Sequence, residues 1–212
     1  MTEGVAPPSI NGATKQTLRL FDWVSDAWYE IQLDARDWKF TRRRSSAILL
    51  PQQAEYTPQA LNLPLLYRWL PDADNRRASI APTAEPAAVS AMAQKNYDDA
   101  TVNYSAQSQP GRPQQWAITP ANNLIVFPPP DQTYLFSANY RTKPVRLKDD
   151  LDEPAFPEEF HLILVWRALM EVAAAEAAPE IYTRARANYE TIRSALISDQ
   201  GPTLTLKGRV LA

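Results

Sequence analysis

Apolar residues recur at helical spacing near both ends of this chain, whereas the residues between the two ends alternate as they do in strands. From Ala13 to Arg36 they stand three or four residues apart, which predicts one amphipathic helix with the stripe Leu18, Phe21, Val24, Trp28 and Ile31. A second helix is predicted to begin at Pro157, and a third is predicted from Pro179 to near Asp199. This pattern predicts an α+β protein.

The terminal helices are expected to pack together as a helical bundle, with the strand-rich residues inserted between them. Residues 1–40 then form an N-terminal arm and the first bundle helix, and residues 41–150 form the β-rich region with one short helix. Residues 151–200 form a helical hairpin of the bundle, and residues 201–212 form an extended C-terminal arm. No internal repeat interrupts this organisation.

Strands are predicted where β-branched and aromatic residues alternate between turn signals. They are residues 40–50, 56–63, 115–119, 123–127 and 133–140. Pro120, Asn122 and Asn123 predict a hairpin turn, because asparagine tolerates left-handed backbone conformations. Residues 85–97 are predicted to be the short helix, with Pro86 in its first turn.

Composition excludes several kinds of function. The 212 residues include no cysteine, so disulfides, thiol catalysis and cysteine-ligated metals are excluded. The net charge of −2 gives no overall basic field that would attract nucleic acid. No apolar run approaches the roughly 20 residues that cross a bilayer, so we expect a soluble protein without a membrane partner. The excess of 19 Pro over 5 Gly favours stiff connections and weakly indicates a scaffold.

The C-terminal segment alternates apolar and polar residues after a helix-stopping Gly-Pro. This period of two predicts a strand that has no partner within the helices before it. We interpret the segment as a docking arm with the residues Gly201, Pro202, Thr203, Leu204, Thr205, Leu206, Lys207, Val210 and Leu211. A frayed terminus or an edge strand on the protein's own sheet is the alternative.

The residues that usually carry catalysis do not form a recognisable constellation in this sequence. His161 is the single histidine, and it has no partner motif for a triad or a metal site. The acidic run of Asp149, Asp150, Asp152 and Glu153 lacks the spacing of a calcium loop and is interpreted as a solvated or ion-pairing loop. We therefore expect no enzyme activity, no metal and no cofactor.

A basic run, Arg42 to Arg44, lies in a predicted strand. Alternate residues of a strand point to opposite faces, so the three arginines cannot form a single patch for DNA. We expect these arginines, together with Asp149, Asp150 and Asp152, to be contacts between subunits. Direct contact with a DNA backbone is the alternative for the arginines.

The chain resembles the head–tail adaptor proteins of tailed bacteriophages, also called connector or head-completion proteins. Four segments carry the resemblance, in order along residues 17–199. They are the Trp-rich end of the first helix from Phe21 through Phe40, Pro110–Pro113, Leu124–Asp131 leading into Tyr134–Tyr140, and Pro144–Leu147 followed by the acidic loop and Phe156–His161. Phe127 departs from the family pattern, in which a tryptophan usually precedes the Pro-rich turn.

The resemblance implies a structural virion protein that assembles as a ring, typically of twelve copies, beneath the portal. Its expected partners are the portal protein, neighbouring copies of itself and a downstream tail protein, and genomic DNA would pass through the ring without sequence-specific binding. Its expected location is the neck of the virion, and the host cytoplasm during assembly. In related connectors the C-terminal arm reaches the portal. Another neck or tail protein, such as a stopper or a tail terminator, is the alternative function.

Overall fold

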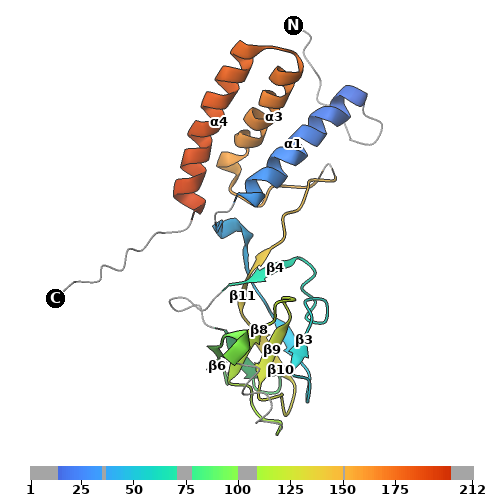
Figure 1. Cartoon of the computed structure of the whole chain (residues 1–212), viewed down its shortest axis with the longest axis vertical. Helices are drawn as coiled ribbons and strands as arrows, with labels where there is room; N and C mark the ends of the chain where they lie inside the picture. The colour runs from blue at the N-terminus through green and yellow to red at the C-terminus, as the bar shows by residue number, and fades with distance from the viewer. Residues whose placement is uncertain (1–13, 35–36, 71–77, 100–108, 150, 202–212) are drawn as a thin grey trace, which may run out of the picture. The chain divides into compact units, whose positions relative to one another are not determined.

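The chain divides into two compact units, each with its own hydrophobic core. The computed structural model describes residues 14–34, 37–70, 78–99, 109–149 and 151–201. One unit comprises Met1–Thr41 with Pro144–Ala212 and is helical, and the other comprises Arg42–Lys143 and consists largely of strands. Helices together with antiparallel sheets confirm the predicted α+β class (Figure 1).

The described residues of the helical unit form three long helices, α1 (Lys15–Leu33), α3 (Leu162–Ala175) and α4 (Pro179–Gln200). Thr14 caps the first of them, where its hydroxyl accepts a hydrogen bond from the Thr17 amide at 3.3 Å. Pro157 precedes a short 3-10 turn, Glu158–Phe160, so α3 begins later than the sequence predicts. Helix α4 begins at the predicted Pro179. Helix α3 packs against both α1 and α4 (Figure 1).

Aromatic rings hold this unit together. Trp28 of α1 lies 5.8 Å from the ring of Phe40 and 5.2 Å from the ring of Phe156. The ring of Trp38 stacks on Phe40, and its indole N–H donates to the Ile31 carbonyl at 2.8 Å. These contacts bind the end of α1, the 3-10 turn Lys39–Thr41 and the segment before α3 to one core.

One charged residue of α3 ties this apolar helix to α1. The Arg167 guanidinium pairs with Glu30 of α1 at 2.9 Å and with Glu171 one turn further along α3. Burial alone would lower the pKa of Arg167, but the hydrogen bonds and charges of Glu171 and Glu30 outweigh burial and raise it. Arg167 therefore stays charged in a partly buried place.

None of the described helices is both long and apolar enough to span a membrane.

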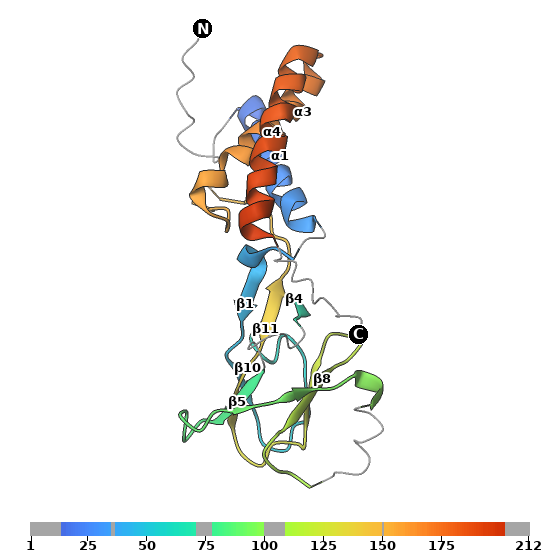
Figure 2. The same ribbon diagram turned by 90° about the vertical axis from the view of Figure 1, so that its left-hand side faces the viewer.

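The described residues of the strand-rich unit form three small sheets. Figures 1 and 2 draw their strands. The first has the order β1 (Arg42–Arg44), β11 (Asn139–Thr142) and β4 (Leu66–Trp69). The second has the order β2 (Ala47–Leu49), β10 (Tyr134–Ser137), β5 (Ser79–Pro82) and β6 (Ser90–Ala91). The third has the order β3 (Glu55–Tyr56), β9 (Leu124–Phe127), β8 (Gln115–Ile118) and β7 (Ala93–Gln94). The main core of the unit is formed by side chains from all three sheets, including Trp69, Phe136 and Trp116.

Two of the predicted strands are each broken in two, at points that face one another. Ser45 and Ser46 separate β1 from β2, and Ala138 separates β10 from β11. The Ser45 hydroxyl accepts the Ala138 amide at 2.8 Å and donates to the Ala138 carbonyl at 3.0 Å. The Ser45 side chain therefore takes the place of backbone hydrogen bonds between the two strands at this point. Both strands can bend here and continue from the second sheet into the first.

The hairpin predicted around Asn122 is confirmed. Strands β8 and β9 pair antiparallel, and Asn122 has a φ of 66°, in the left-handed region that asparagine tolerates. The strand predicted over residues 56–63 is wrong for most of its length. Only Glu55–Tyr56 is a strand there, and it pairs with β9 rather than with the strand before it.

The helix predicted over residues 85–97 is wrong for most of its length. Strands β6 and β7 lie there, separated by the buried Met92. They are end strands of two different sheets, since β6 pairs with β5 and β7 pairs with β8. Pairing with these distant strands outweighs the local helical preference of an Ala-rich segment.

Candidate interaction surfaces

The predicted docking arm begins where α4 ends. Gly201 is buried, and its amide donates to the Ile197 carbonyl at 2.9 Å, which caps the helix. A β-carbon on Gly201 would lie 2.3 Å from that carbonyl oxygen, so only glycine fits. The other arm residues, Pro202 to Leu211, lie outside the described residues, and the docking arm stays a prediction.

The three arginines predicted as subunit contacts form β1. They pair with β11, where Arg42 lies opposite Arg141 and Arg44 lies opposite Asn139. Alternation places Arg42 and Arg44 on one side of the sheet and Arg43 on the other. The Arg44 guanidinium donates to the Ser79 hydroxyl at 3.1 Å. Their contact with another subunit stays a prediction.

The register of the first sheet adds two arginines that sequence reasoning missed. Arg141 lies between Arg42 of β1 and Arg68 of β4, so three arginines form a row across three strands. Cross-strand neighbours share one face of the sheet. No sequence signal marks this row, because it depends on the pairing of residues about 70 to 100 positions apart in the chain.

The acidic loop uses one of its carboxylates to form a turn. One Asp152 oxygen accepts the Lys148 amide at 2.6 Å and the Asp149 amide at 3.0 Å. These two backbone hydrogen bonds lower the pKa of Asp152 below its ordinary value of 3.8. Asp150 lies outside the described residues. The acidic loop belongs to the helical unit, whereas the β1 arginines belong to the strand-rich unit. The contact with another subunit therefore stays one prediction for the loop and a separate prediction for the arginines.

The turn at Asp152 is expected to depend on pH. Because the folded pKa is lowered, the carboxylate supports the turn at pH values above 3.8 and loses its effect as the pH falls through the folded pKa. Amide resonances of Lys148 and Asp149 in an NMR titration should shift below pH 3.8, and Asp152→Asn should give the shifted positions already at pH 7. A Glu153→Gln variant is the control, and equal shifts in both variants would contradict this role.

His161 has a structural position at the start of α3. Its ring nitrogen Nε2 lies 3.1 Å from the Phe156 carbonyl oxygen, and its ring lies 5.3 Å from the Phe156 ring. Within the described residues no three His, Cys, Asp or Glu side chains gather into a group that could hold a metal ion. The contacts of His161 fit a packing role and not that of a general base.

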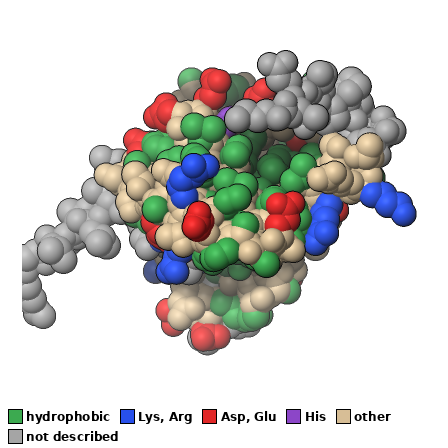
Figure 3. Space-filling model, turned by 90° about the horizontal axis from the view of Figure 1, so that it is seen from above, with side chains coloured by type: hydrophobic (Ala, Val, Ile, Leu, Met, Phe, Trp, Pro, Cys, Tyr) green, Lys and Arg blue, Asp and Glu red, His purple; other side chains and the backbone are tan. Residues whose placement is uncertain are grey.

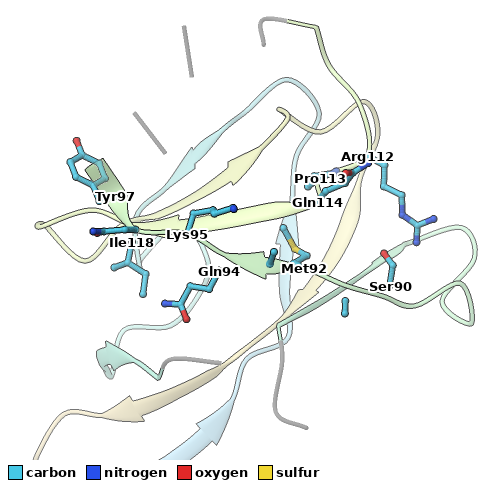
Figure 4. Close-up of a pocket in the computed structure, with 12 residues that line it drawn as sticks. Ser90, Met92, Gln94, Lys95, Tyr97, Arg112, Pro113, Gln114 and Ile118 are labelled. Atoms are coloured by element: carbon cyan, nitrogen blue, oxygen red, sulfur yellow. The ribbon is translucent and has the colours of Figure 1, made fainter. Parts of the chain in front are cut away.

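The strand-rich unit has a hollow of about 1120 Å³ beside β6 and β7 (Figure 4). Its charged lining groups are Lys95 and Arg112, and the remainder are amides, small side chains, Tyr97 and three larger apolar residues, Met92, Pro113 and Ile118. Arg112 donates to the Ala88 carbonyl at 2.7 Å, which fixes its guanidinium at one end. Among the described lining residues, the titratable side chains are Lys95, Tyr97 and Arg112, and none is a carboxylate or an imidazole.

Charged and apolar side chains are mixed on the face of the protein that Figure 3 draws. Figure 3 shows one face, on which hydrophobic side chains lie among acidic and basic ones. The candidate contact residues that the structure describes lie in a turn and in a pair of strands.

Comparison with known protein families identifies the class of protein to which the chain belongs. The sequence model of the SU10 adaptor protein family matches residues 7–207, nearly the whole chain. The chain belongs to this family of bacteriophage head–tail adaptors, which confirms the resemblance seen in the sequence. No curated protein matches the chain. The protein is thus a structural adaptor of a bacteriophage, and its family implies a place in the virion.

Proposed function

We propose that this protein forms a ring beneath the portal at one capsid vertex and joins the capsid to the tail. Twelve copies, the number that the resemblance implies, would extend the DNA channel, and DNA would pass without sequence-specific contacts. The observation that carries this proposal is the family match over residues 7–207. The helices would form the bundle of each subunit, and the ring would lie in the neck of the virion.

The division into two units supports a joining role. Each unit has its own core, so each can present a surface to a different neighbour without unfolding the other. The partners would be the portal on one side and a tail protein on the other. The C-terminal arm would dock on the portal, where buried leucines and added main-chain hydrogen bonds fix each copy. Because the contact between arm and portal would be repeated around the ring, the whole ring would bind the portal tightly even if each single contact is weak.

Removal of residues 202–212 is expected to abolish portal binding and leave the subunit folded. The deletion keeps Gly201, whose amide caps α4, so the helix should not fray. Binding is measured by co-sedimentation of the purified chain with the portal protein of the same virus. Undiminished binding by the truncated chain would overturn the role of the arm.

Paired substitutions in the full chain test which side of the arm docks. Leu204→Asp with Leu206→Asp should abolish portal binding, because alternation places both leucines on one side of an extended segment. Thr203→Asp with Thr205→Asp is the matched control, since it adds the same charge on the other side and should keep most of the binding. Equal losses from the two pairs would argue against a strand-like dock.

The mass and image of the portal complex separate the adaptor from the alternative function. An adaptor ring should lie directly on the portal with one copy for each portal subunit. A stopper or a tail terminator would bind a preformed adaptor or tail instead and would leave a bare portal unoccupied. Native mass spectrometry and electron microscopy of the mixture distinguish these outcomes.

A further inference from the structure

Helix α3 exposes a strip of apolar side chains along one side. We call it the α3 strip, and it consists of Leu162, Val165, Leu169 and Val172. These residues recur at intervals of three and four, so they share one side of the helix. Leu162 is 58% exposed and Val165 is 52% exposed, and the other two are half-buried. The charged residues of the helix, Arg167 and Glu171, lie on the opposite side, where they pair with one another.

The neighbouring helices expose mixed surfaces, in which a few apolar residues such as Leu20 and Tyr182 stand among charged and polar ones. The exposed side of α4 carries Arg184, Glu190 and Ser194, and that of α1 carries Lys15, Asp22 and Glu30. Apart from Arg167 and Glu171, α3 carries no charged residue, and a helix of that composition is typical of a buried position. The buried residues of α3 already face the helical core, through Ile163 and Leu164, so the α3 strip is a second apolar surface on the same helix.

Acidic residues stand at both ends of the α3 strip. Glu158 comes four residues before Leu162, and Glu176 comes four residues after Val172. Both side chains are exposed, and neither forms an ion pair with any residue in the described part of the chain. A partner surface for this strip should therefore be apolar and should carry a positive charge.

The helical unit itself carries such a surface. We call it the α1/α4 face, and it consists of Leu20, Tyr182 and Arg186. Leu20 is 42% exposed and Tyr182 is 37% exposed. Arg186 is exposed and has no ion pair among the described residues.

Helical spacing gives the side of its helix on which each of the three residues lies. Leu20 lies on the side of α1 that carries Ile31, eleven residues later, and Tyr182 and Arg186 lie on the side of α4 that carries Arg193. Ile31 and Arg193 line one cavity of about 80 Å³, and Arg193 donates to Asp34 of α1 at 2.8 Å. The residues of the α1/α4 face therefore lie on the sides of α1 and α4 that meet at this cavity, nearer the N-terminal end of each helix.

We propose that the α3 strip of one copy packs against the α1/α4 face of the next copy, with Arg186 placed between the apolar contact and an acidic end of the strip. The two surfaces are different and belong to one compact unit, so the contact is head-to-tail and repeats from copy to copy around a ring. This inference rests on the proposed ring and names the surfaces that close it.

Disulfide trapping tests the contact directly, because the chain contains no cysteine of its own. Two sets of full-length single variants are made, Val165→Cys and Val172→Cys on the strip, and Leu20→Cys and Tyr182→Cys on the opposite face. Copies from the two sets carry different tags and are mixed before mild oxidation. Since each chain has one thiol, every disulfide must join two copies. Ser194→Cys, on the exposed polar side of α4, is the matched control.

The expected result is a disulfide between a strip copy and a face copy, in yields at least tenfold above those with Ser194→Cys. The mixtures are oxidised alone over a wide concentration range and also in the complex with portal. Disulfides only between two strip copies would show a symmetric contact and overturn the proposal. Absence of strip-to-face disulfides under both conditions, or equal yields with the control, would also overturn it.

The same experiment separates this inference from the proposed function. Portal binding without strip-to-face disulfides in the complex leaves the adaptor role intact and refutes the α3 contact. Strip-to-face disulfides in a protein that does not bind portal support the α3 contact and refute the portal-bound ring.

Discussion

Replacement of Phe136 by alanine is expected to destabilise the strand-rich unit by about 3–5 kcal/mol. Phe136 is fully buried in β10, and its ring lies 5.9 Å from Trp69 and 6.0 Å from Trp116. The two tryptophans come from the other two sheets, so the cavity left by alanine would lie where all three sheets meet. Since a domain is stable by about 5–15 kcal/mol, the loss would be a large share of the total.

Hydrogen exchange is the informative measurement because it reports the two units separately. Exchange should rise throughout Arg42–Lys143 and stay unchanged in α3 and α4, whose core is separate. Leu135→Ala is the matched control. Leu135 is the preceding residue of β10, is only half-buried and points to the other side of the sheet, so its loss should be well under half as large. Equal rises in both units would show that they unfold together and would contradict this prediction.

Local signals explain which parts of the fold could be predicted from the sequence. The stripe that includes Trp28 and Ile31 defines α1, and Pro179 marks the first residue of α4. The β8–β9 hairpin was predictable because Asn122 and its neighbours form the turn without help from distant residues. Each of these features depends on residues that are close in the chain, so propensity and periodicity suffice.

The errors in the prediction arise where distant pairing decides. Ser90 and Gln94 lie in a segment with a helical composition, yet one pairs with β5 and the other with β8. The bend at Ser45 requires Ala138, 93 residues later in the chain. An alternating pattern gives the length of a strand but not its partner, so the sequence predicted single long strands where the structure has bent pairs.

The candidate surfaces were predictable to different degrees. The acidic loop and the basic strand stand out by composition, but only the structure shows that Asp152 forms a turn and that Arg42 joins a row with Arg141. The α3 strip could not be predicted from the sequence, because a helix with so few charged residues is typical of a buried position. Exposure in the folded unit distinguishes Val165 from Ile163, and this information requires tertiary structure.

Replacement of Trp28 by alanine is expected to destabilise the helical unit by about 3–5 kcal/mol. Trp28 is 2% exposed and contacts the rings of both Phe40 and Phe156, which bring the segments after α1 and before α3 into one core. Loss of the indole would leave a cavity that these segments cannot fill without leaving their places. Denaturant unfolding combined with hydrogen exchange measures the loss, which should fall on α1, α3 and α4 and spare residues 42–143.

Trp23→Ala is the matched control on the same helix. Trp23 is half-buried, and its ring is covered by the Arg19 guanidinium at 4.6 Å rather than by core side chains. An exposed cation–π contact contributes about 0.5–1 kcal/mol, so its removal should cost far less than the removal of Trp28. Because the α3 strip and the α1/α4 face both depend on the packing of this unit, Trp28→Ala should also abolish disulfide trapping between copies, whereas Trp23→Ala should preserve it. Equal destabilisation by the two substitutions would mean that the aromatic cluster around Trp28 does not hold the helices together.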